Sequence, residues 1–262
     1  MRENTVRSIW ARGGVVVNGW LTLPSSFSAE VMAHQGFDSL VIDMQHGVVD
    51  YQTAVTMLQA ISTTPVIPLA RVPWNDPAHL MKILDAGVYG VICPMVNNRA
   101  QAEALVRACK YPPRGIRSFG PVRASIYAGA DYGEHANEDL IVMPMIETKE
   151  ALENLDAILS TPGVDAAYVG PADLSLALGC TPRLDQTDAP VVEAQKTIAA
   201  ACQRHGVVAG IHNATAEYAL KMIDLGYRFV TLASDSRFLA AKAATEVAAV
   251  RQTASKGKLP AY

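Results

Sequence analysis

Short apolar runs rich in Val and Ile alternate with longer segments of helical periodicity along almost the whole chain. This alternation is typical of βαβ units, which build parallel sheets. The strands we predict are residues 15–23, 39–43, 66–71, 90–94, 140–147, 166–170, 207–212 and 229–233. The helices we predict are residues 29–35, 51–61, 77–86, 99–109, 149–159, 190–205, 214–225 and 236–251.

Eight such units favour a closed (β/α)8 TIM barrel over an open doubly wound sheet. A length of 262 residues fits one barrel. No Gly-x-Gly-x-x-Gly turn follows the first predicted strand, which removes the main argument for a dinucleotide-binding fold. We therefore predict one domain over residues 1–262, with a long loop at 111–139 and a short C-terminal tail from about residue 253. The loop is expected to be a lid, an oligomer contact or a solvated excursion.

Composition narrows the partners and the compartment. Half of the residues are hydrophobic and 18% are charged, which suits one large core. The net charge is −3 with no block of Lys or Arg, so neither nucleic acid nor a membrane is an expected partner. No apolar run has transmembrane length, and charges in Met1–Trp10 argue against a signal peptide. Four cysteines without a CxxC pair fit a reducing cytoplasm.

Two consecutive predicted strands each end by presenting a carboxylate. Met143-Pro-Met-Ile-Glu147 ends at Glu147, and Tyr168-Val-Gly-Pro-Ala-Asp-Leu174 delivers Asp173. Residues just past parallel strands lie at the C-terminal mouth of a barrel, where active sites are built. Two carboxylates at one mouth form a natural seat for a hard divalent cation. The alternative for each residue is a plain helix-capping role.

A histidine and an arginine are predicted at the same mouth. His46 follows the strand at 39–43, and Arg71 ends the strand at 66–71. Together with the carboxylates they could supply a base, an oxyanion clamp and a metal seat. His46 could instead be an ordinary loop histidine. His212, at the end of the seventh strand, could face the mouth, but a hydrogen-bonded polar residue at the barrel rim is the favoured interpretation.

Six motifs in order resemble a known family. They are Asp43-Met-Gln-His-Gly47, Pro68-Leu-Ala-Arg-Val72, Leu84-Asp-Ala-Gly87, Tyr111-Pro-Pro-Arg-Gly115, Ile146-Glu-Thr148 and Val169-Gly-Pro-Ala-Asp-Leu174. From about Asn18 to about Ala249 the chain resembles the metal-dependent class II pyruvate aldolases of the HpcH/HpaI family, which also includes citrate lyase. The family includes 4-hydroxy-2-oxoheptanedioate and 2-keto-3-deoxy sugar-acid aldolases.

The resemblance implies a role for each matched residue. Glu147 and Asp173 match the protein ligands of a divalent cation, usually magnesium, manganese or cobalt. His46 matches the catalytic base, and Asp85 matches an acid that raises its basicity. Arg71 matches the transition-state stabiliser, which also contacts the substrate.

Two further positions match the substrate site. Ala172 matches a residue whose backbone contacts the bound 2-oxo acid, and Asp173 beside it is expected to contact the substrate as well. Met145 stands where the family has a glutamine that touches substrate. A thioether cannot donate a hydrogen bond, so Met145 is expected to line the pocket and to shift the substrate range.

The implied reaction is reversible aldol cleavage of a 4-hydroxy-2-oxo acid to pyruvate and an aldehyde (EC 4.1.2.-). A metal acting as a Lewis acid would stabilise the pyruvate enolate, Arg71 would add a fixed cation, and His46 would accept the C4 hydroxyl proton. No lysine ends a predicted strand, which argues against a Schiff-base mechanism.

Other functions stay open at this point. One alternative is a citrate-lyase-β or malyl-CoA-lyase-like enzyme that acts on an acyl-CoA thioester, with Arg114, Arg117 and Arg123 near the CoA phosphates. A remoter one is a non-catalytic binding barrel. The resemblance also implies a homohexamer whose subunits exchange C-terminal helices, for which the Ala-rich segment Phe238–Val250 is suited.

Overall fold

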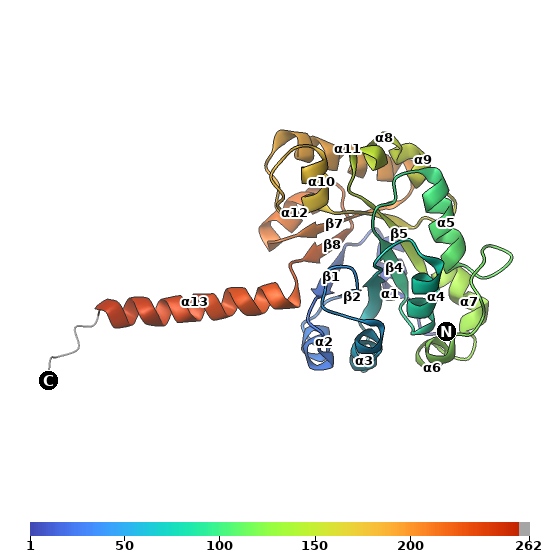
Figure 1. The fold of residues 1–262 in the computed structure, drawn as a ribbon, viewed down its shortest axis with the longest axis horizontal. Helices are drawn as coiled ribbons and strands as arrows, with labels where there is room; N and C mark the ends of the chain where they lie inside the picture. Colours follow the sequence, from blue (N-terminus) through green and yellow to red (C-terminus); the bar gives the residue numbers. More distant parts are fainter. Residues whose placement is uncertain (257–262) are drawn as a thin grey trace.

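Eight parallel strands close into a barrel in the computed structural model, which describes the backbone of residues 1–256 and side chains as far as residue 251 (Figure 1). Each strand pairs with its neighbours in sequence, and β1 pairs with β8 to close the barrel. The predicted TIM barrel is confirmed. The strands are β1 (Val16–Leu21), β2 (Ser39–Asp43), β3 (Ile67–Arg71), β4 (Gly90–Cys93), β5 (Ile141–Ile146), β6 (Ala166–Val169), β7 (Val208–Asn213) and β8 (Phe229–Leu232).

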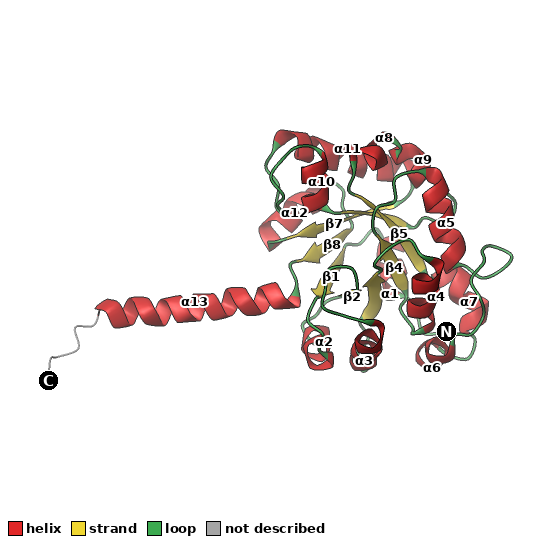
Figure 2. Cartoon of the chain, in the orientation of Figure 1, coloured by secondary structure: helices red, strands yellow, loops and turns green. Residues whose placement is uncertain are grey.

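Helices surround the barrel, as Figure 2 shows. Several begin at side-chain caps, because a side-chain oxygen there accepts a backbone N–H of the first turn. The helices are α1 (Thr5–Ala11), α2 (Ser26–Ala33), α3 (Tyr51–Ile61), α4 (Pro77–Asp85), α5 (Arg99–Cys109), α6 (Val122–Ala128), α7 (Tyr132–Asp139), α8 (Lys149–Glu153), α9 (Leu155–Leu159), α10 (Pro171–Ala177), α11 (Ala189–His205), α12 (Ala216–Asp224) and α13 (Asp235–Lys256).

The predicted loop at 111–139 is wrong in one respect, because it contains the two short helices α6 and α7. The N-caps are Pro121 for α6 and Asp131 for α7, and neither side chain makes a capping hydrogen bond. Buried Ala124, Ala128, Tyr132 and Ala136 hold them against the rest of the protein. Tertiary packing therefore stabilises two helices that local helix propensity alone does not predict.

Three further differences concern helix bounds. The helix predicted at 149–159 is divided at Asn154 into α8 and α9, and α1 and α10 were not predicted. Helix α13 continues to Lys256, whereas the tail was expected from about residue 253; residues 257–262 lie outside the described part. In Figure 1 this helix projects away from the barrel. No described helix is both long and apolar enough to cross a membrane.

Aromatic side chains fill the middle of the barrel. The rings of Trp20 and Tyr168 stack at 5.6 Å, and Tyr168 meets Phe229 edge-on at 6.0 Å. All three are almost fully buried. This packed layer forms the floor on which the polar residues at the mouth rest.

Candidate active site

A cavity of about 250 Å³ opens at the C-terminal mouth of the barrel. Five of the residues predicted from the sequence line it: His46, Arg71, Met145, Ala172 and Asp173. The remaining lining residues are Trp20, Thr22, Asp43, Tyr168, Gly170, Pro171, Leu184, His212, Ser234 and Arg237. The structure therefore gathers most of the predicted site at one mouth.

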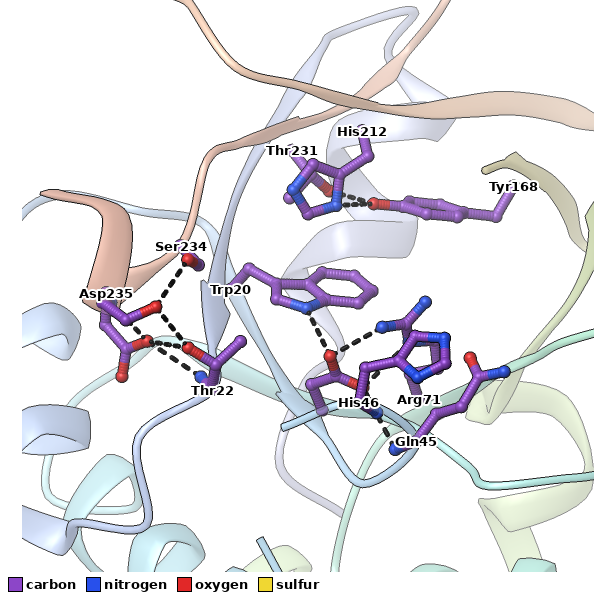
Figure 3. A network of polar contacts seen from close by, with 12 residues as sticks. Trp20, Thr22, Gln45, His46, Arg71, Tyr168, His212, Thr231, Ser234 and Asp235 are labelled. Atoms are coloured by element: carbon purple, nitrogen blue, oxygen red, sulfur yellow. Dashed lines mark hydrogen bonds and ion pairs between the residues drawn. The ribbon is translucent and has the colours of Figure 1, made fainter. Parts of the chain in front are cut away.

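Asp43 accepts hydrogen bonds from Arg71, Trp20, Gln45 and His46, four residues that Figure 3 labels. It ends β2 directly beside Arg71, its register partner on β3. Arg71 donates through Nε to Oδ1 at 2.9 Å and through a terminal nitrogen to Oδ2 at 2.6 Å. The indole of Trp20 donates to Oδ2 at 3.1 Å, and its ring lies 4.9 Å from the guanidinium carbon of Arg71. Arg71 is thus fixed by a bidentate ion pair and by a ring face.

The same carboxylate shapes the loop that carries the histidine. Oδ1 of Asp43 accepts the backbone N–H groups of Gln45 and His46 at 3.1 and 3.2 Å. A side chain at Gly47 would meet the Asp43 carbonyl oxygen at 2.2 Å, so only glycine fits this turn. The ring of His46 lines the cavity, is exposed, and makes no hydrogen bond to a described residue. It is therefore available to a ligand.

Asp43 stays ionised although it is almost fully buried. Burial alone would raise its pKa, but the hydrogen bonds and charge of Arg71, with support from Trp20, hold the pKa of Asp43 below its ordinary value. No role was predicted for this residue from the sequence. Its place at the end of a predicted strand, three residues before His46, was the signal that could have revealed one.

Glu147 lies against Gly170, which precedes Asp173 by three residues. Glu147 is buried and its Oε1 accepts the backbone N–H of Met95 at 2.8 Å. A side chain at Gly170 would meet Oε2 of Glu147 at 2.4 Å, so the chain passes close over this carboxylate. Asp173 follows in the first turn of α10 and lines the cavity.

Neither carboxylate serves as a helix cap. The cap of α8 is Thr148, whose hydroxyl accepts the N–H of Ala151 at 3.0 Å, and not Glu147. The N-cap of α10 is Gly170, and no side chain caps that helix. Neither residue is therefore an N-cap, although Asp173 lies in the first turn of α10.

The electrostatics of the pair fit a divalent cation. Burial, and then the charge of Asp173, raise the pKa of Glu147 to about 7. Two carboxylates whose charges act on each other favour a cation between them. The described residues offer no group of three or more His, Cys, Asp and Glu side chains suited to a metal. A cation here would have Glu147 and Asp173 as protein ligands, with its other positions left for oxygen ligands from substrate and water.

His212 lines the cavity and is also hydrogen-bonded on both sides of its ring. Nε2 lies 2.9 Å from the carbonyl oxygen of Ala233, which can only accept, so this nitrogen carries a proton. Nδ1 lies 3.1 Å from the hydroxyl of Tyr168, which also contacts Thr231. Both sequence interpretations of His212 therefore hold, since it faces the mouth and is satisfied by partners.

The ring of His212 is held neutral. Burial, and then the positive charge of Arg71, lower its pKa to about 4. Asp43 acts in the opposite direction, while Arg237 adds a further lowering effect. His212 is therefore suited to positioning its neighbours and unsuited to a general-base role near neutral pH.

Asp85 is the predicted residue that the structure does not bring to the site. It ends α4, which starts at the mouth and runs about 13 Å toward the other end of the barrel at 1.5 Å per residue. Its carboxylate accepts from Arg117 at 2.6 Å, and the Arg117 side chain is fully buried. Within one chain, Asp85 is thus committed to an ion pair remote from His46.

The chain matches known proteins over most of its length. The sequence model of the family described as HpcH/HpaI aldolase/citrate lyase matches residues 18–242. A hydroxypyruvate/pyruvate aldolase from Rhizorhabdus wittichii is 42% identical over 248 residues, covering 95% of this chain and 99% of that protein. A 4-hydroxy-2-oxo-heptane-1,7-dioate aldolase from Escherichia coli is 39% identical over 252 residues, with 94% of each covered.

A solved structure agrees with these matches. The crystal structure of an HpcH/HpaI aldolase/citrate lyase family protein from Burkholderia cenocepacia superposes with a TM-score of 0.89 at 30% identity. The match covers 95% of this chain and all of that one.

Proposed function

The chain belongs to the HpcH/HpaI aldolase/citrate lyase family, and from this premise we propose that it cleaves a 4-hydroxy-2-oxo acid reversibly to pyruvate and an aldehyde. The observation that carries the proposal is one cavity lined by a free histidine, an arginine fixed by Asp43, and a carboxylate beside Glu147. Relatives named as pyruvate aldolases support the same reaction.

Each residue has a task that follows from its surroundings. Glu147 and Asp173 would hold a divalent cation, which when bound supplies Lewis-acid stabilisation of the charge that develops on the 2-oxo group. Magnesium, manganese and cobalt all accept such oxygen ligands. Arg71 presents a guanidinium that cannot rotate away, because Asp43 and Trp20 hold it. A fixed cation of this kind stabilises a developing oxyanion without reorganisation.

The proton steps fall to His46. Its ring accepts the C4 hydroxyl proton while the C3–C4 bond breaks, and the bonding electrons pass to C3 as the enolate of pyruvate. The aldehyde leaves, and the proton held by His46 is available to C3, which completes pyruvate. Ala172 and Met145 line the cavity beside these groups and complete the pocket for the 2-oxo acid.

The acyl-CoA alternative loses its main support in this chain. Arg114 pairs with Glu138, Arg117 pairs with Asp85, and Arg123 donates to the carbonyl of Ala86. None of the three arginines lines the cavity at the mouth. A CoA phosphate at this mouth would therefore lack the predicted cations.

A homohexamer with exchanged C-terminal helices is part of the proposal. Helix α13 leaves the barrel and exposes apolar side chains, with Leu239 65% and Val250 68% exposed. A second copy of the chain would cover them. Because Asp85 is remote from its own His46, any pairing between these residues would have to form between subunits.

Four unpaired cysteines support a reducing, cytoplasmic location.

A pyruvate-release assay tests the proposal. Pyruvate release is measured from a panel of 4-hydroxy-2-oxo acids, and cleavage of malyl-CoA is followed separately by the formation of acetyl-CoA, with and without EDTA and then with added manganese, cobalt or magnesium. We expect release from the 4-hydroxy-2-oxo acids alone, lost in EDTA and restored by metal. Consumption of malyl-CoA alone, or full activity in EDTA, would overturn the assignment.

Paired variants separate chemistry from folding. Glu147→Gln should lose cleavage and the binding of Mn²⁺ measured by calorimetry, while far-ultraviolet circular dichroism stays unchanged. Glu150→Gln makes the same change at an exposed position on α8 and should behave like the natural protein. Equal activity of the two variants would contradict the proposed metal-binding site.

A further inference from the structure

The cavity at the mouth has a second side that the proposed reaction does not yet use. Arg71, Met145 and Asp173 line the side where the 2-oxo acid half would bind. A second set of lining residues comes from the end of β1 and the residue after it, β7, the β8–α13 connection and the first turn of α13, together with one leucine from the loop after α10. These residues are Trp20, Thr22, Leu184, His212, Ser234 and Arg237. If the proposed function holds, this second side receives the aldehyde half of the substrate.

Arg237 carries a charge on this side that no described residue neutralises. Its guanidinium makes no ion pair or hydrogen bond with any residue whose side chain is described, and its backbone N–H alone contacts the hydroxyl of Ser234. The nearby carboxylates are engaged elsewhere. Asp43 is held by Arg71 in the bidentate pair, and Asp235 faces the start of α2.

The position of Arg237 is fixed although its side chain is exposed. Asp235 begins α13, and its Oδ1 accepts the backbone N–H and the hydroxyl of Thr22 at 2.8 and 2.9 Å (Figure 3). Its Oδ2 accepts the hydroxyl of Ser28 at 2.9 Å and the N–H of Leu23 at 3.3 Å. These bonds tie the first turn of α13 to the β1–α2 connection, so Arg237 stays at the rim of the cavity.

The neighbouring groups define what could lie between the reacting carbons and this arginine. Leu184 and the ring of Trp20 offer apolar contacts, while Thr22 and Ser234 offer hydroxyl groups. His212 adds no charge, because its pKa lies well below neutrality. A short carbon chain that ends in an anion would contact the apolar groups and the hydroxyl groups along its length and the Arg237 guanidinium at its end.

We propose that Arg237 determines specificity by binding an anionic group at the far end of the aldehyde substrate. A guanidinium forms two parallel hydrogen bonds with a carboxylate or a phosphate, which gives both affinity and orientation. Carboxylate and phosphate share this chemistry, so the proposal names an anionic aldehyde and leaves the choice between them to experiment. The inference rests on the proposed aldolase function.

Aldol addition to matched acceptors tests this inference. Pyruvate is kept saturating with Mn²⁺ present, and kcat/KM is measured for succinic semialdehyde against butanal and for glyceraldehyde 3-phosphate against glyceraldehyde. We expect the natural enzyme to prefer the anionic member of one pair. In Arg237→Gln that preference should fall by about 10–100-fold, chiefly through KM, because a hydrogen bond to a charged group contributes roughly 1.5–3 kcal/mol.

The controls make each outcome decisive. Arg251→Gln changes an exposed arginine on the same helix and should keep the full preference. An equal loss for anionic and neutral aldehydes in Arg237→Gln, or no anionic preference in the natural enzyme, would overturn the inference while leaving the aldolase function intact. No addition to any aldehyde would instead overturn the proposed function. The pair in which preference appears identifies the anion as carboxylate or phosphate.

Discussion

Replacing Asp43 with asparagine tests the network that fixes Arg71. Three N–H groups point at Oδ1, from Arg71, Gln45 and His46, and two point at Oδ2, from Arg71 and Trp20. In Asp43→Asn an NH₂ group must replace one oxygen, and at either place it meets N–H donors. The less damaging orientation keeps oxygen at Oδ1 and loses both bonds at Oδ2.

The size of the effect follows from burial. Arg71 is 11% exposed and Asp43 2% exposed, so the ion pair is poorly screened. Losing one partner of a buried pair costs about 3–5 kcal/mol of stability. Turnover should fall by about two to three orders of magnitude, the usual cost of losing a fixed donor to an oxyanion, because Arg71 is no longer held in place.

The assay combines urea denaturation with pyruvate release under saturating metal. Asp156→Asn is the matched control, since Asp156 also pairs with an arginine, Arg204 at 2.9 Å, but on the exposed surface. That control should leave both readouts almost unchanged, because exposed ion pairs contribute little. If Asp43→Asn matched the control in turnover and in denaturation midpoint, the fixed orientation of Arg71 would not depend on Asp43.

His46→Ala should lose aldol cleavage by roughly 10²–10⁴-fold while oxalate still binds, and loss of oxalate binding would point to a structural role. Gly170→Ala should weaken Mn²⁺ binding by about 10–100-fold, because the new methyl group would displace Glu147, whereas Gly120→Ala, in open space, should not. His212 binds its proton less tightly in the folded than in the unfolded chain, whose pKa is near 6.5. Its contribution to the free energy of unfolding is therefore fully present above pH 6.5 and falls by up to about 1.4 kcal/mol per unit down to about pH 4. Urea denaturation at pH 7, 6 and 5 should show this loss in the natural protein and less of it in His212→Gln; parallel curves would refute it.

The strands could be predicted because strands buried on both faces read as continuous apolar runs. Residues 39–43 were predicted as the structure has them, and the other strands differ by a few residues at their ends. The short helices α6 and α7 were not predicted, because segments of seven and eight residues show little periodicity and these two are held by tertiary contacts. The division at Asn154 was not predicted, because the apolar residues on its two sides follow one helical periodicity.

The location of most candidate site residues could be predicted, but their contacts only in part. Residues that follow the predicted strands were expected at the mouth of the barrel. His46 and Arg71, predicted in this way, do line the cavity. Register between neighbouring strands is not visible in one sequence, so the pairing of Asp43 with Arg71 was missed. Asp85 was assigned a role by resemblance, but the length of α4 carries it away from His46.

Backbone conformation explains why the finer geometry of the site is hidden in the sequence. Among the described residues, Met95 and Ala233 are the two non-glycine residues with positive φ, at 57° and 41°. Such conformations cost of order 1–3 kcal/mol and persist only where the surroundings enforce them. The N–H of Met95 holds the Glu147 carboxylate, and the carbonyl of Ala233 holds the ring of His212. Neither methionine nor alanine signals a left-handed backbone, so the closed barrel, and not local sequence preference, imposes the two conformations that orient these side chains.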